Sequence, residues 1–579
     1  MSVKKLDAFG DNVETKERVV PAFGIDLGTT NSAISIVSVG NAAKTIKLVS
    51  GKTTMPSCIM WKGVPGEFIV GDEAYEHRYQ ANTVYSIKRH MCEPDYVQEL
   101  EYNGKKITMT PAEVSAEILK GLVKKVGNAY GEIHDVVVTV PAYFRQEGLM
   151  ATKKACELAG LNLLRLFKEP TAAALNYKLD DSTKSKSAIV YDLGGGTFDV
   201  SVVNIAAKSD DSEAKNLYGF DEDETSSNAD EDVNSVITVA AVDGNSQLGG
   251  DDYDRELYKI FQKKLVANGV PESVITEEEK EKMILHLEKL KKDTVYAEYL
   301  IPYSYGGDKY TGRITFTPED FVTGFIPVYE QTRTLVNKAI RSSGIKPDTI
   351  VLVGGSTKNP ILLDLLKRDY PTMTINNGLN PDESVANGAA INAKRIKFGR
   401  GAVQIFDVVP IAIGIHDKDH VKHLIAKNAQ LPTTNTEFFT TTKDNQTSLT
   451  ITILQGNSIV PEECDVLCNL SIDGIKPAPA GEPDLAITLS INVDGILKCT
   501  AKIDDITKEI EVSTNGKGKT EKTSKEEKII RRWRAFADQL NDKEKDELLK
   551  LIDLYPEKAS KSLIVSYIQS HRNVFGDVK

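Results

Sequence analysis

Two short turns, far apart in the sequence, combine a carboxylate, glycines and threonines in the same order. The first reads DLGTTN at residues 26–31, and the second reads DLGGGTFD at residues 192–199. Each turn follows an apolar run that predicts a buried strand and precedes a second strand-like run. Glycine lets backbone N–H groups face a ligand without a Cβ in the way, and threonine adds a hydroxyl donor. Two such hairpins facing each other would hold a polyphosphate between two halves of one domain.

The aspartates of these turns suit metal and water chemistry. Asp26 opens the first turn, and Asp192 and Asp199 bracket the second. Carboxylate oxygens bind hydrated Mg²⁺ and orient attacking water molecules. The two turns together therefore predict a site for a polyphosphate and its metal ion.

A third glycine-containing turn follows the apolar run at residues 349–353. Gly354 and Gly355 would let the backbone lie close to a nucleoside, and Ser356 offers a hydrogen bond. Any one of these turns alone is more often an ordinary hairpin or βα loop. The set of three, in this order, favours a nucleoside polyphosphate.

Eight motifs in a fixed order, which include these turns, resemble the nucleotide-binding domain of the seventy-kilodalton heat-shock, DnaK-like family of molecular chaperones. They read GIDLGTTNS, NTVYSIKR, VVVTVPAYF, EPTAAALNY, VYDLGGGTFDVSV, LGGDDYD, VLVGGSTKNP and NPDESVANGAA. The resemblance continues through the downstream β region and fades after about Val512. It implies an ATP-dependent chaperone that hydrolyses ATP to ADP and phosphate. This hydrolysis would control the capture and release of extended hydrophobic segments of unfolded proteins.

The resemblance, with the alternation of apolar runs along the chain, predicts a multidomain protein. The expected parts are a flexible leader at 1–20, an actin-like two-lobed α/β ATPase domain at 21–398, a linker at 399–408, an all-β sandwich peptide-binding domain at 409–514, and a hinge with a short α-helical lid at 515–579.

Catalytic roles are implied by the resemblance for Lys88, Glu169, Asp192, Thr197 and Asp199. Lys88 would contact the terminal phosphate of ATP and the attacking water, and Glu169 would sense that phosphate. The ordinary alternative for Lys88 is a surface lysine on a loop.

The same resemblance implies bound ATP or ADP, Mg²⁺ and K⁺. The metal ions would lie near Asp26, Asp192 and Asp199. The other residues expected at the nucleotide are Gly28, Thr29, Thr30, Asn31, Gly194, Gly195, Gly196, Gly249, Gly250, Glu288, Lys291, Lys292, Gly354, Gly355, Ser356, Lys358 and Asp382.

The expected adenine pocket departs from the family pattern. Where family members commonly place two arginines around the base, this chain has Lys292 and Lys358. A planar guanidinium stacks on an aromatic base, whereas an ammonium acts as a point charge. We therefore expect a weaker nucleotide affinity, by about 1 kcal/mol, the scale of one exposed cation–π contact.

Residues expected to couple the domains are Pro141, Arg165 and Asp407. The arginine that usually accompanies the proline is replaced by Leu149, and Lys168 replaces the usual asparagine beside Arg165. The sequence therefore predicts that peptide stimulates hydrolysis only weakly.

An acidic insertion at about 208–234, rich in Ser and Asn, has the composition of a disordered loop. It falls in a hairpin that the family uses, with Arg165 and the linker, to dock J-domain co-chaperones. Extra acidic charge would attract the basic helix of a J-domain from a distance. The alternative is a tolerated surface loop without a role.

The expected peptide site lies in the β region. Its residues, as implied by the resemblance, are Ile413, Ile415, Lys418, Phe439, Thr442 and Leu449. Alternating apolar residues also form the core of any β-sandwich, so both interpretations stay open.

Two alternative functions are considered beside the chaperone. A family member acting mainly as a nucleotide-exchange partner or holdase, with weak ATPase coupling, is favoured by Leu149 and the altered adenine pocket. A different actin-fold ATPase, such as a sugar kinase, is opposed by the linker and β region, which such kinases do not need.

Composition narrows the partners. The formal net charge of −12 argues against nucleic acid and anionic membranes, and no apolar run approaches the length of a membrane span. Six cysteines in 579 residues are too few for a disulfide scaffold. We expect a cytoplasmic or nuclear monomer that binds unfolded polypeptides, J-domain co-chaperones and nucleotide-exchange factors.

Overall fold

The computed structural model describes residues 21–37, 42–178, 186–207, 235–293, 296–378, 380–398, 403–417, 420–503 and 506–511, with short pieces at 5–6, 12–13, 547 and 550–551. Strands β1 (Lys5–Leu6) and β2 (Asn12–Val13) pair with each other. The chain divides into the compact units Met1–Asn515 and Gly516–Lys579. The expected leader, acidic insertion, lid and Lys418 lie outside the main described ranges.

The first lobe contains a mixed sheet with the strand order β13-β12-β3-β4-β5, in which β6 also pairs with β4. Strand β12 reads DVVVTV, and its nearly continuous burial is typical of a parallel strand covered on both faces. The strands are β3 (Ala22–Leu27), β4 (Asn31–Val37), β5 (Lys44–Thr45), β6 (Thr54–Pro56), β12 (Asp135–Val140) and β13 (Asn162–Lys168).

Smaller elements complete the first lobe. Helix α2 begins with a capping box, in which Thr110 accepts a hydrogen bond from the backbone N–H of Glu113. The elements are β7 (Cys58–Trp61), β8 (Phe68–Val70), α1 (Asp72–Glu76), β9 (Thr83–Tyr85), the 3₁₀ helix η1 (Ile87–His90), β10 (Gln98–Tyr102), β11 (Lys105–Met109), α2 (Pro111–Val126), η2 (Gly127–Tyr130) and α3 (Gln146–Leu158).

The second lobe contains a sheet with the order β20-β19-β14-β15-β16-β21. Its long helix α8 starts at a Thr317–Asp320 capping box and ends at Gly344, whose φ of 65° suits a glycine C-cap. Its elements are α4 (Glu169–Lys178), β14 (Lys186–Leu193), β15 (Phe198–Ala207), β16 (Ser235–Asn245), α6 (Gly250–Ala267), η3 (Glu272–Val274), α7 (Glu277–Lys292), β17 (Tyr299–Tyr305), β18 (Tyr310–Phe316), α8 (Pro318–Ser343), β19 (Thr349–Val353), η4 (Gly355–Lys358), α9 (Pro360–Asp369) and β20 (Thr374–Asn376). Helix α10 (Ser384–Phe398) follows them and packs against the sheet of the first lobe.

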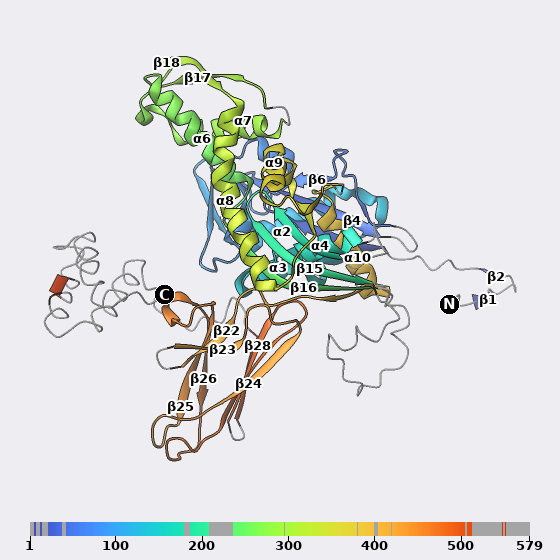
Figure 1. The fold of residues 1–579 in the computed structure, drawn as a ribbon, viewed down its shortest axis with the longest axis vertical. Coiled ribbons are helices and arrows are strands. Elements are labelled where there is room, and N and C mark those ends of the chain that lie inside the picture. Colours follow the sequence, from blue (N-terminus) through green and yellow to red (C-terminus); the bar gives the residue numbers. More distant parts are fainter. Residues whose placement is uncertain are drawn as a thin grey trace. The chain divides into compact units, whose positions relative to one another are not determined.

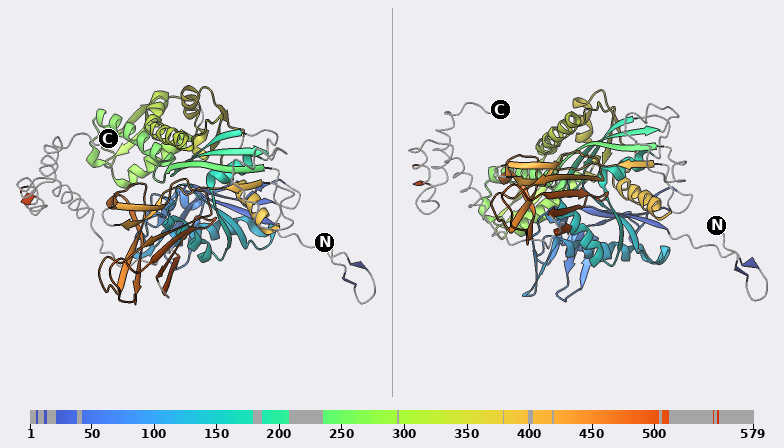
Figure 2. Two further views of the ribbon diagram at one scale, coloured as in Figure 1. Left: turned by 60° about the horizontal axis from the view of Figure 1, so that its bottom comes forward. Right: turned by 90° about the horizontal axis from the view of Figure 1, so that it is seen from below.

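Each sheet packs against helices of its own lobe, and a third cluster, which includes residues of α4 and α10, joins the two sheets. One hydrophobic cluster joins the sheet of the first lobe to α2, and an aromatic-rich cluster packs α6, α7 and α8 against the second sheet. Figure 2 shows the blue strands of the first sheet and the green strands of the second as separate layers.

Helices α4 and α10 meet between the two sheets through small residues. A Cβ on Gly388 of α10 would lie 1.9 Å from the carbonyl oxygen of Ala172 in α4, and one on Gly24 of β3 would lie 2.1 Å from the Ala390 nitrogen. The backbones approach closely because these positions have no side chain. This packing fixes α4, whose first residue is Glu169.

The expected linker contains a strand. Strand β21 (Val403–Phe406) pairs in parallel with β16 and extends the sheet of the second lobe at its edge. The sequence did not predict this pairing, because four residues are too few for a period-2 pattern to indicate which sheet they join.

The β region forms two four-stranded antiparallel sheets, labelled in part in Figure 1. We call it the β domain; its buried side chains form one core. The strands are β22 (Ile413–Asp417), β23 (His420–Ile425), β25 (Ser448–Gln455) and β26 (Asp465–Asp473) in one sheet, with the short helix η5 (Pro461–Glu463), and β24 (Thr433–Phe439), β27 (Leu485–Ile491), β28 (Leu497–Ile503) and β29 (Ile506–Glu511) in the other.

The strands predicted after both glycine-containing turns are confirmed as β4 and β15, and the hairpin predicted near residue 494 is confirmed as β27–β28. None of the helices that the structure describes is long and apolar enough to span a bilayer.

Replacing Gly388 by Ala is expected to destabilise the ATPase region. The new methyl group must push α10 away from α4, and overpacking of this kind costs about 1–3 kcal/mol. Urea unfolding, followed by circular dichroism, measures the loss. Gly378→Ala is the matched control, because its Cβ would meet no atom closer than 3.6 Å. Equal unfolding midpoints for the two variants would contradict the packing argument.

Candidate functional site

A cavity of about 390 Å³ lies where the β3–β4 turn, the β14–β15 turn and the loop after β19 meet. Almost all the residues predicted to contact nucleotide line it. They are Asp26, Gly28, Thr29, Thr30, Asn31, Lys88, Glu169, Asp192, Gly194, Gly195, Thr197, Gly249, Gly250, Glu288, Lys291, Lys292, Gly354, Gly355, Ser356, Lys358 and Asp382.

Gly196 and Asp199 are the predicted residues that do not line this cavity. A Cβ on Gly196 would lie 2.3 Å from the Thr29 Cγ2, so this glycine packs against the opposite turn. Asp199 is buried behind the cavity and accepts a hydrogen bond from the backbone N–H of Tyr143 at 3.0 Å.

The two turns close against each other because of glycine. A Cβ on Gly195 would lie 1.6 Å from the Thr30 hydroxyl oxygen, and one on Gly249 would lie 2.6 Å from the Gly195 backbone. Among the described residues, nothing forms a hydrogen bond with the buried Oγ1 atoms of Thr29 and Thr30. Unused donors in a cradle of backbone amides fit a bound phosphate chain.

Lys88 lies inside the cavity, not on a surface loop. It sits on η1, is buried, and forms a 2.5 Å ion pair with Glu169, the first residue of α4. Burial lowers the pKa of Lys88, but the carboxylates of Glu169 and Asp26 outweigh burial and raise it above its usual value. The lysine therefore stays charged at the phosphate end of the cavity.

The buried carboxylates hold protons more tightly than free aspartate. Burial, with the nearby Glu169, raises the pKa of Asp26 and of Asp199 to about 7, and raises that of Asp192 well above its usual range. Asp192 and Asp199 occupy opposite positions in the register of the β14–β15 hairpin. The side chain of Thr139 donates to Asp26 at 3.1 Å. Ionising these groups together requires positive charge, which Lys88 alone does not supply.

A hydrated Mg²⁺ fits this charge pattern better than a directly ligated ion. In the part of the chain that the structure describes, no three His, Cys, Asp or Glu side chains are placed to hold a metal together. Mg²⁺ keeps several waters and binds through one or two carboxylates plus phosphate oxygens. Asp26 and Asp192 would hold such an ion through its water shell.

Glu288 is the charged centre of the expected nucleoside end. Arg78 forms a 2.5 Å ion pair with it, and Tyr75 and Lys292 each donate to its other oxygen at 2.6 Å. Burial alone would raise the pKa of Glu288, but Arg78, then Lys292 and Lys291, lower it to about 2. The sequence indicated Glu288 and the lysines but gave no signal for Arg78 or Tyr75.

The two lysines that replace arginines are both ion-paired and half exposed. Lys292 pairs with Glu288, and Lys358 pairs with Asp382. Neighbouring Lys291 is tied more deeply, to Asp254 at 2.7 Å. Lys292 and Lys358 therefore line the rim of the cavity with mobile point charges, whereas a guanidinium would offer a flat surface.

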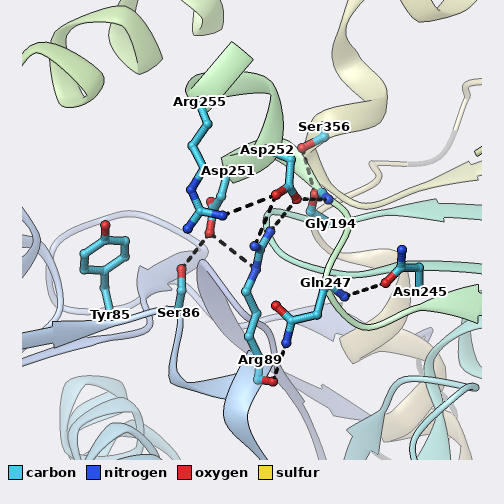
Figure 3. Close-up of polar contacts among 12 residues, drawn as sticks. Tyr85, Ser86, Arg89, Gly194, Asn245, Gln247, Asp251, Asp252, Arg255 and Ser356 are labelled. Carbon is cyan, nitrogen blue, oxygen red and sulfur yellow. Dashed lines mark hydrogen bonds and ion pairs between the residues drawn. The ribbon is translucent and has the colours of Figure 1, made fainter. Parts of the chain in front are cut away.

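A polar cluster ties η1 to helix α6 across the cavity, as Figure 3 shows. The Arg89 guanidinium is 2.7 Å from Asp252, Ser86 donates to Asp251 at 2.8 Å, and Gln247 donates to the Arg89 carbonyl at 2.9 Å. The motifs NTVYSIKR and LGGDDYD contain most of these residues, but their spacing did not indicate that they meet.

Two of the three expected coupling residues, Arg165 and Asp407, contact the β domain. The guanidinium of Arg165 is 3.6 Å from Asp494, in the turn between β27 and β28. Asp407 is half-buried directly after β21 and accepts from the Thr171 hydroxyl at 3.1 Å, and its backbone carbonyl accepts from the Leu431 backbone N–H. Pro141 follows β12 and is buried.

Leu149 and Lys168 are buried at the same place. A Cβ on Gly495 would lie 3.2 Å from Leu149 and 3.9 Å from the Lys168 nitrogen. Burial lowers the pKa of Lys168, although Asp407 and Asp199 oppose this effect. The turn at Gly495 is therefore seated against a leucine where the family usually has an arginine.

Gln146 makes the contact that sequence reasoning missed. Its buried side-chain amide donates to the Gly495 carbonyl at 2.6 Å and accepts from the Leu497 backbone N–H at 3.0 Å. These two partners lie 349 and 351 residues after Gln146 in the sequence, so no local pattern could have indicated them. Both ends of one amide thus bind the backbone of the β domain.

The predicted peptide residues have different surroundings. Ile413 and Ile415 are buried in the core of the β domain, as the core interpretation expected. Phe439 and Leu449 are half-buried and pack on the edge of that core, and Thr442 is exposed. Of the predicted peptide residues that the structure describes, Phe439, Leu449 and Thr442 are therefore the accessible ones.

One comparison with known proteins bears on this site. The family model described as Hsp70 protein matches residues 22–209 and 233–561, which include every described residue of the cavity and of the β domain. Members of that family are generally ATP-dependent chaperones with ATPase activity. With the glycine cradle, the buried lysine and the β domain in the order that the motifs indicated, the chain belongs to the Hsp70 family.

Proposed function

We propose that this protein binds and hydrolyses ATP in the cavity between its lobes. The cycle of ATP binding and hydrolysis would control capture and release of extended hydrophobic segments of unfolded polypeptides. The observation that carries the proposal is the buried Lys88–Glu169 pair at the end of a cradle whose threonine hydroxyls form no hydrogen bond with any described residue. Such a set of groups suits phosphoryl chemistry, which depends on positioning and charge neutralisation.

The proposed role of each cavity residue follows from its position along the phosphate chain. The hydroxyls of Thr29 and Thr30 and the amides of the glycine-containing turns would hold the phosphates, and Lys88 would place its positive charge at the terminal one. Asp26 and Asp192 line the cavity and would orient the hydrated metal ion and the attacking water, and Asp199 would support them from behind the lining. Bound Mg²⁺ would supply further charge neutralisation.

Coupling to the β domain is proposed to run through the first turn of α4. Glu169 faces the phosphate end of the cavity, and Thr171, two residues later, holds Asp407 after the linker strand. A change in the charge around Glu169 would therefore affect the Thr171–Asp407 hydrogen bond, because Glu169 and Thr171 lie in the same helical turn. This geometry supports a docked arrangement that responds to the bound nucleotide.

The holdase or exchange-partner alternative keeps one supporting observation. Leu149 gives the Gly495 turn no charged partner at the position of the family arginine. Membership of the Hsp70 family removes the sugar-kinase alternative. Clients, a J-domain co-chaperone and an exchange factor are inferred from the family.

Lys88→Ala is expected to abolish hydrolysis, because no other cation in the described cavity lies beside Glu169. We expect single-turnover hydrolysis with Mg²⁺ and K⁺ to fall by at least about 100-fold, the scale of one lost transition-state interaction. Quenched-flow assays with and without an extended Leu-rich peptide measure it, with exposed Lys52→Ala as the control. A rate indifferent to Lys88 and to peptide would favour the holdase.

The double variant Lys292→Arg, Lys358→Arg is expected to bind nucleotide more tightly. Guanidinium groups at the rim would stack on adenine, and the gain would be about 1 kcal/mol, or about fivefold. Calorimetric titration with ADP and Mg²⁺ measures it. Lys280→Arg on the same helix α7, outside the cavity lining, is the control. Unchanged affinity would mean that the base does not contact these side chains.

Gln146→Ala is expected to weaken the docked arrangement, because it removes two hydrogen bonds from a buried interface. Each unsatisfied buried group costs about 1–3 kcal/mol. ATP-induced release of a labelled peptide should slow by at least fivefold, with peptide affinity in ADP unchanged. Exposed Lys154→Ala on the same helix is the control. Full ATP-induced release in the Gln146 variant would show that docking does not depend on this amide.

A further inference from the structure

A second cavity, of about 250 Å³, adjoins the first at its phosphate end. Thr29, Thr30, Asp251 and Asp254 line both cavities. Lys88 lines the first and its neighbour Arg89 lines the second, so consecutive residues of η1 serve different cavities. The second cavity therefore begins where the phosphate chain of a bound nucleotide would end.

The wall between the two cavities consists of threonine side chains against bare glycine backbone. The Thr30 side chain lies at the position that a Cβ on Gly195 would occupy, and the Thr29 side chain touches Gly196. The Arg89 Nε lies 2.7 Å from the Cβ position of Gly196, on the far side of that wall. Rotation of a threonine side chain changes the width of this wall without any movement of the backbone.

Several hydrogen-bond donors that line the second cavity lack an acceptor. Arg78 and Arg89 have side chains only 4% and 5% exposed, and the Nε atom of each forms no hydrogen bond in the described part of the chain, although the Arg89 Nε lies 3.8 Å from a carboxylate oxygen of Asp251. The Thr29 and Thr30 hydroxyls are likewise unpartnered. All four residues line the second cavity, and unused donors along a cavity suit a ligand made of acceptors.

The acceptors of this cavity, by contrast, already have partners. Asp251 accepts from Ser86, Asp254 forms an ion pair with Lys291, and the Tyr85 hydroxyl donates to Glu281. A cation entering here would compete with these bonds, whereas an anion would add partners to the free donors. The lining therefore favours a small oxyanion over a metal ion.

We propose that the second cavity is the exit route and transient binding site for inorganic phosphate. This inference rests on the proposed hydrolysis, in which a water oxygen bonds to the terminal phosphorus and the bond to the bridging oxygen of ADP breaks. While ADP occupies the first cavity, phosphate cannot leave past the nucleoside. The free donors of Arg89 and Arg78 then receive it in sequence on the way out.

Arg255 lies at the outer end of this route. It is more than half exposed, forms a 3.3 Å contact with Asp252, and lines the second cavity but not the first. Arg255→Glu therefore places a negative charge at the exit without touching the nucleotide cavity. Lys259→Glu, one turn later on α6, is the matched control, since it makes the same charge change outside both cavities.

The test measures phosphate release with a fluorescent phosphate-binding protein after one turnover of ATP, beside chemical-quench measurement of hydrolysis. Arg255→Glu should slow phosphate release at least fivefold while hydrolysis stays at the wild-type rate, and Lys259→Glu should match wild type. Ile284→Trp, which fills the cavity from α7, should slow release as well. Normal release in both Arg255→Glu and Ile284→Trp would overturn the proposal.

A second arm separates this inference from the proposed function. Inorganic phosphate is titrated into the ADP- and Mg²⁺-bound protein and followed by calorimetry. Saturable binding that weakens at least fivefold in Arg255→Glu, but not in Lys259→Glu, supports the site even if no hydrolysis occurs. Equal phosphate binding in wild type and Arg255→Glu would assign the phosphate to the first cavity and overturn the proposal.

Discussion

The contact between two turns at residues 26–31 and 192–199 is the constraint on which the rest of the molecule depends. Gly195 and Gly196 carry no side chain, so Thr30 and Thr29 fill the space where a Cβ would stand. Because the turns belong to different sheets, this contact joins the two lobes. It also creates the phosphate cradle. A side chain at Gly195 would therefore have two effects at once: it would separate the lobes, and it would destroy the cradle.

Buried carboxylates gather around that contact, together with one buried lysine that offsets part of their negative charge. Burial raises the pKa values of Asp26, Asp192 and Asp199, while Lys88 remains charged beside Glu169. Burial of this kind favours protonated carboxylates, and a bound cation reverses this preference. The cavity is therefore matched to a ligand that arrives with its own metal ion.

The sequence was sufficient for the cradle and insufficient for the contacts that join distant segments. Glycines and aspartates in a turn are local signals, so the three turns could be identified from their residues, whereas Lys88, Glu169 and Glu288 were expected from the family resemblance. Arg78 and Gln146 carry no such signal, because their partners are brought to them only by the fold. The strand at 403–406 was missed for the same reason, since its role is defined by β16. Gly196 and Asp199 were assigned to the lining, although they support it from behind.

Gln146 binds the β domain through backbone atoms alone, at Gly495 and Leu497. A backbone carbonyl and N–H persist whatever side chain the residue carries. The two hydrogen bonds therefore set no requirement on the side chain of Leu497, which is constrained instead by its burial in the core of the β domain. The ATPase half does have such a requirement, because one side chain supplies both bonds. For these two hydrogen bonds, the identity of the side chain therefore matters only at Gln146, on the ATPase side of the contact.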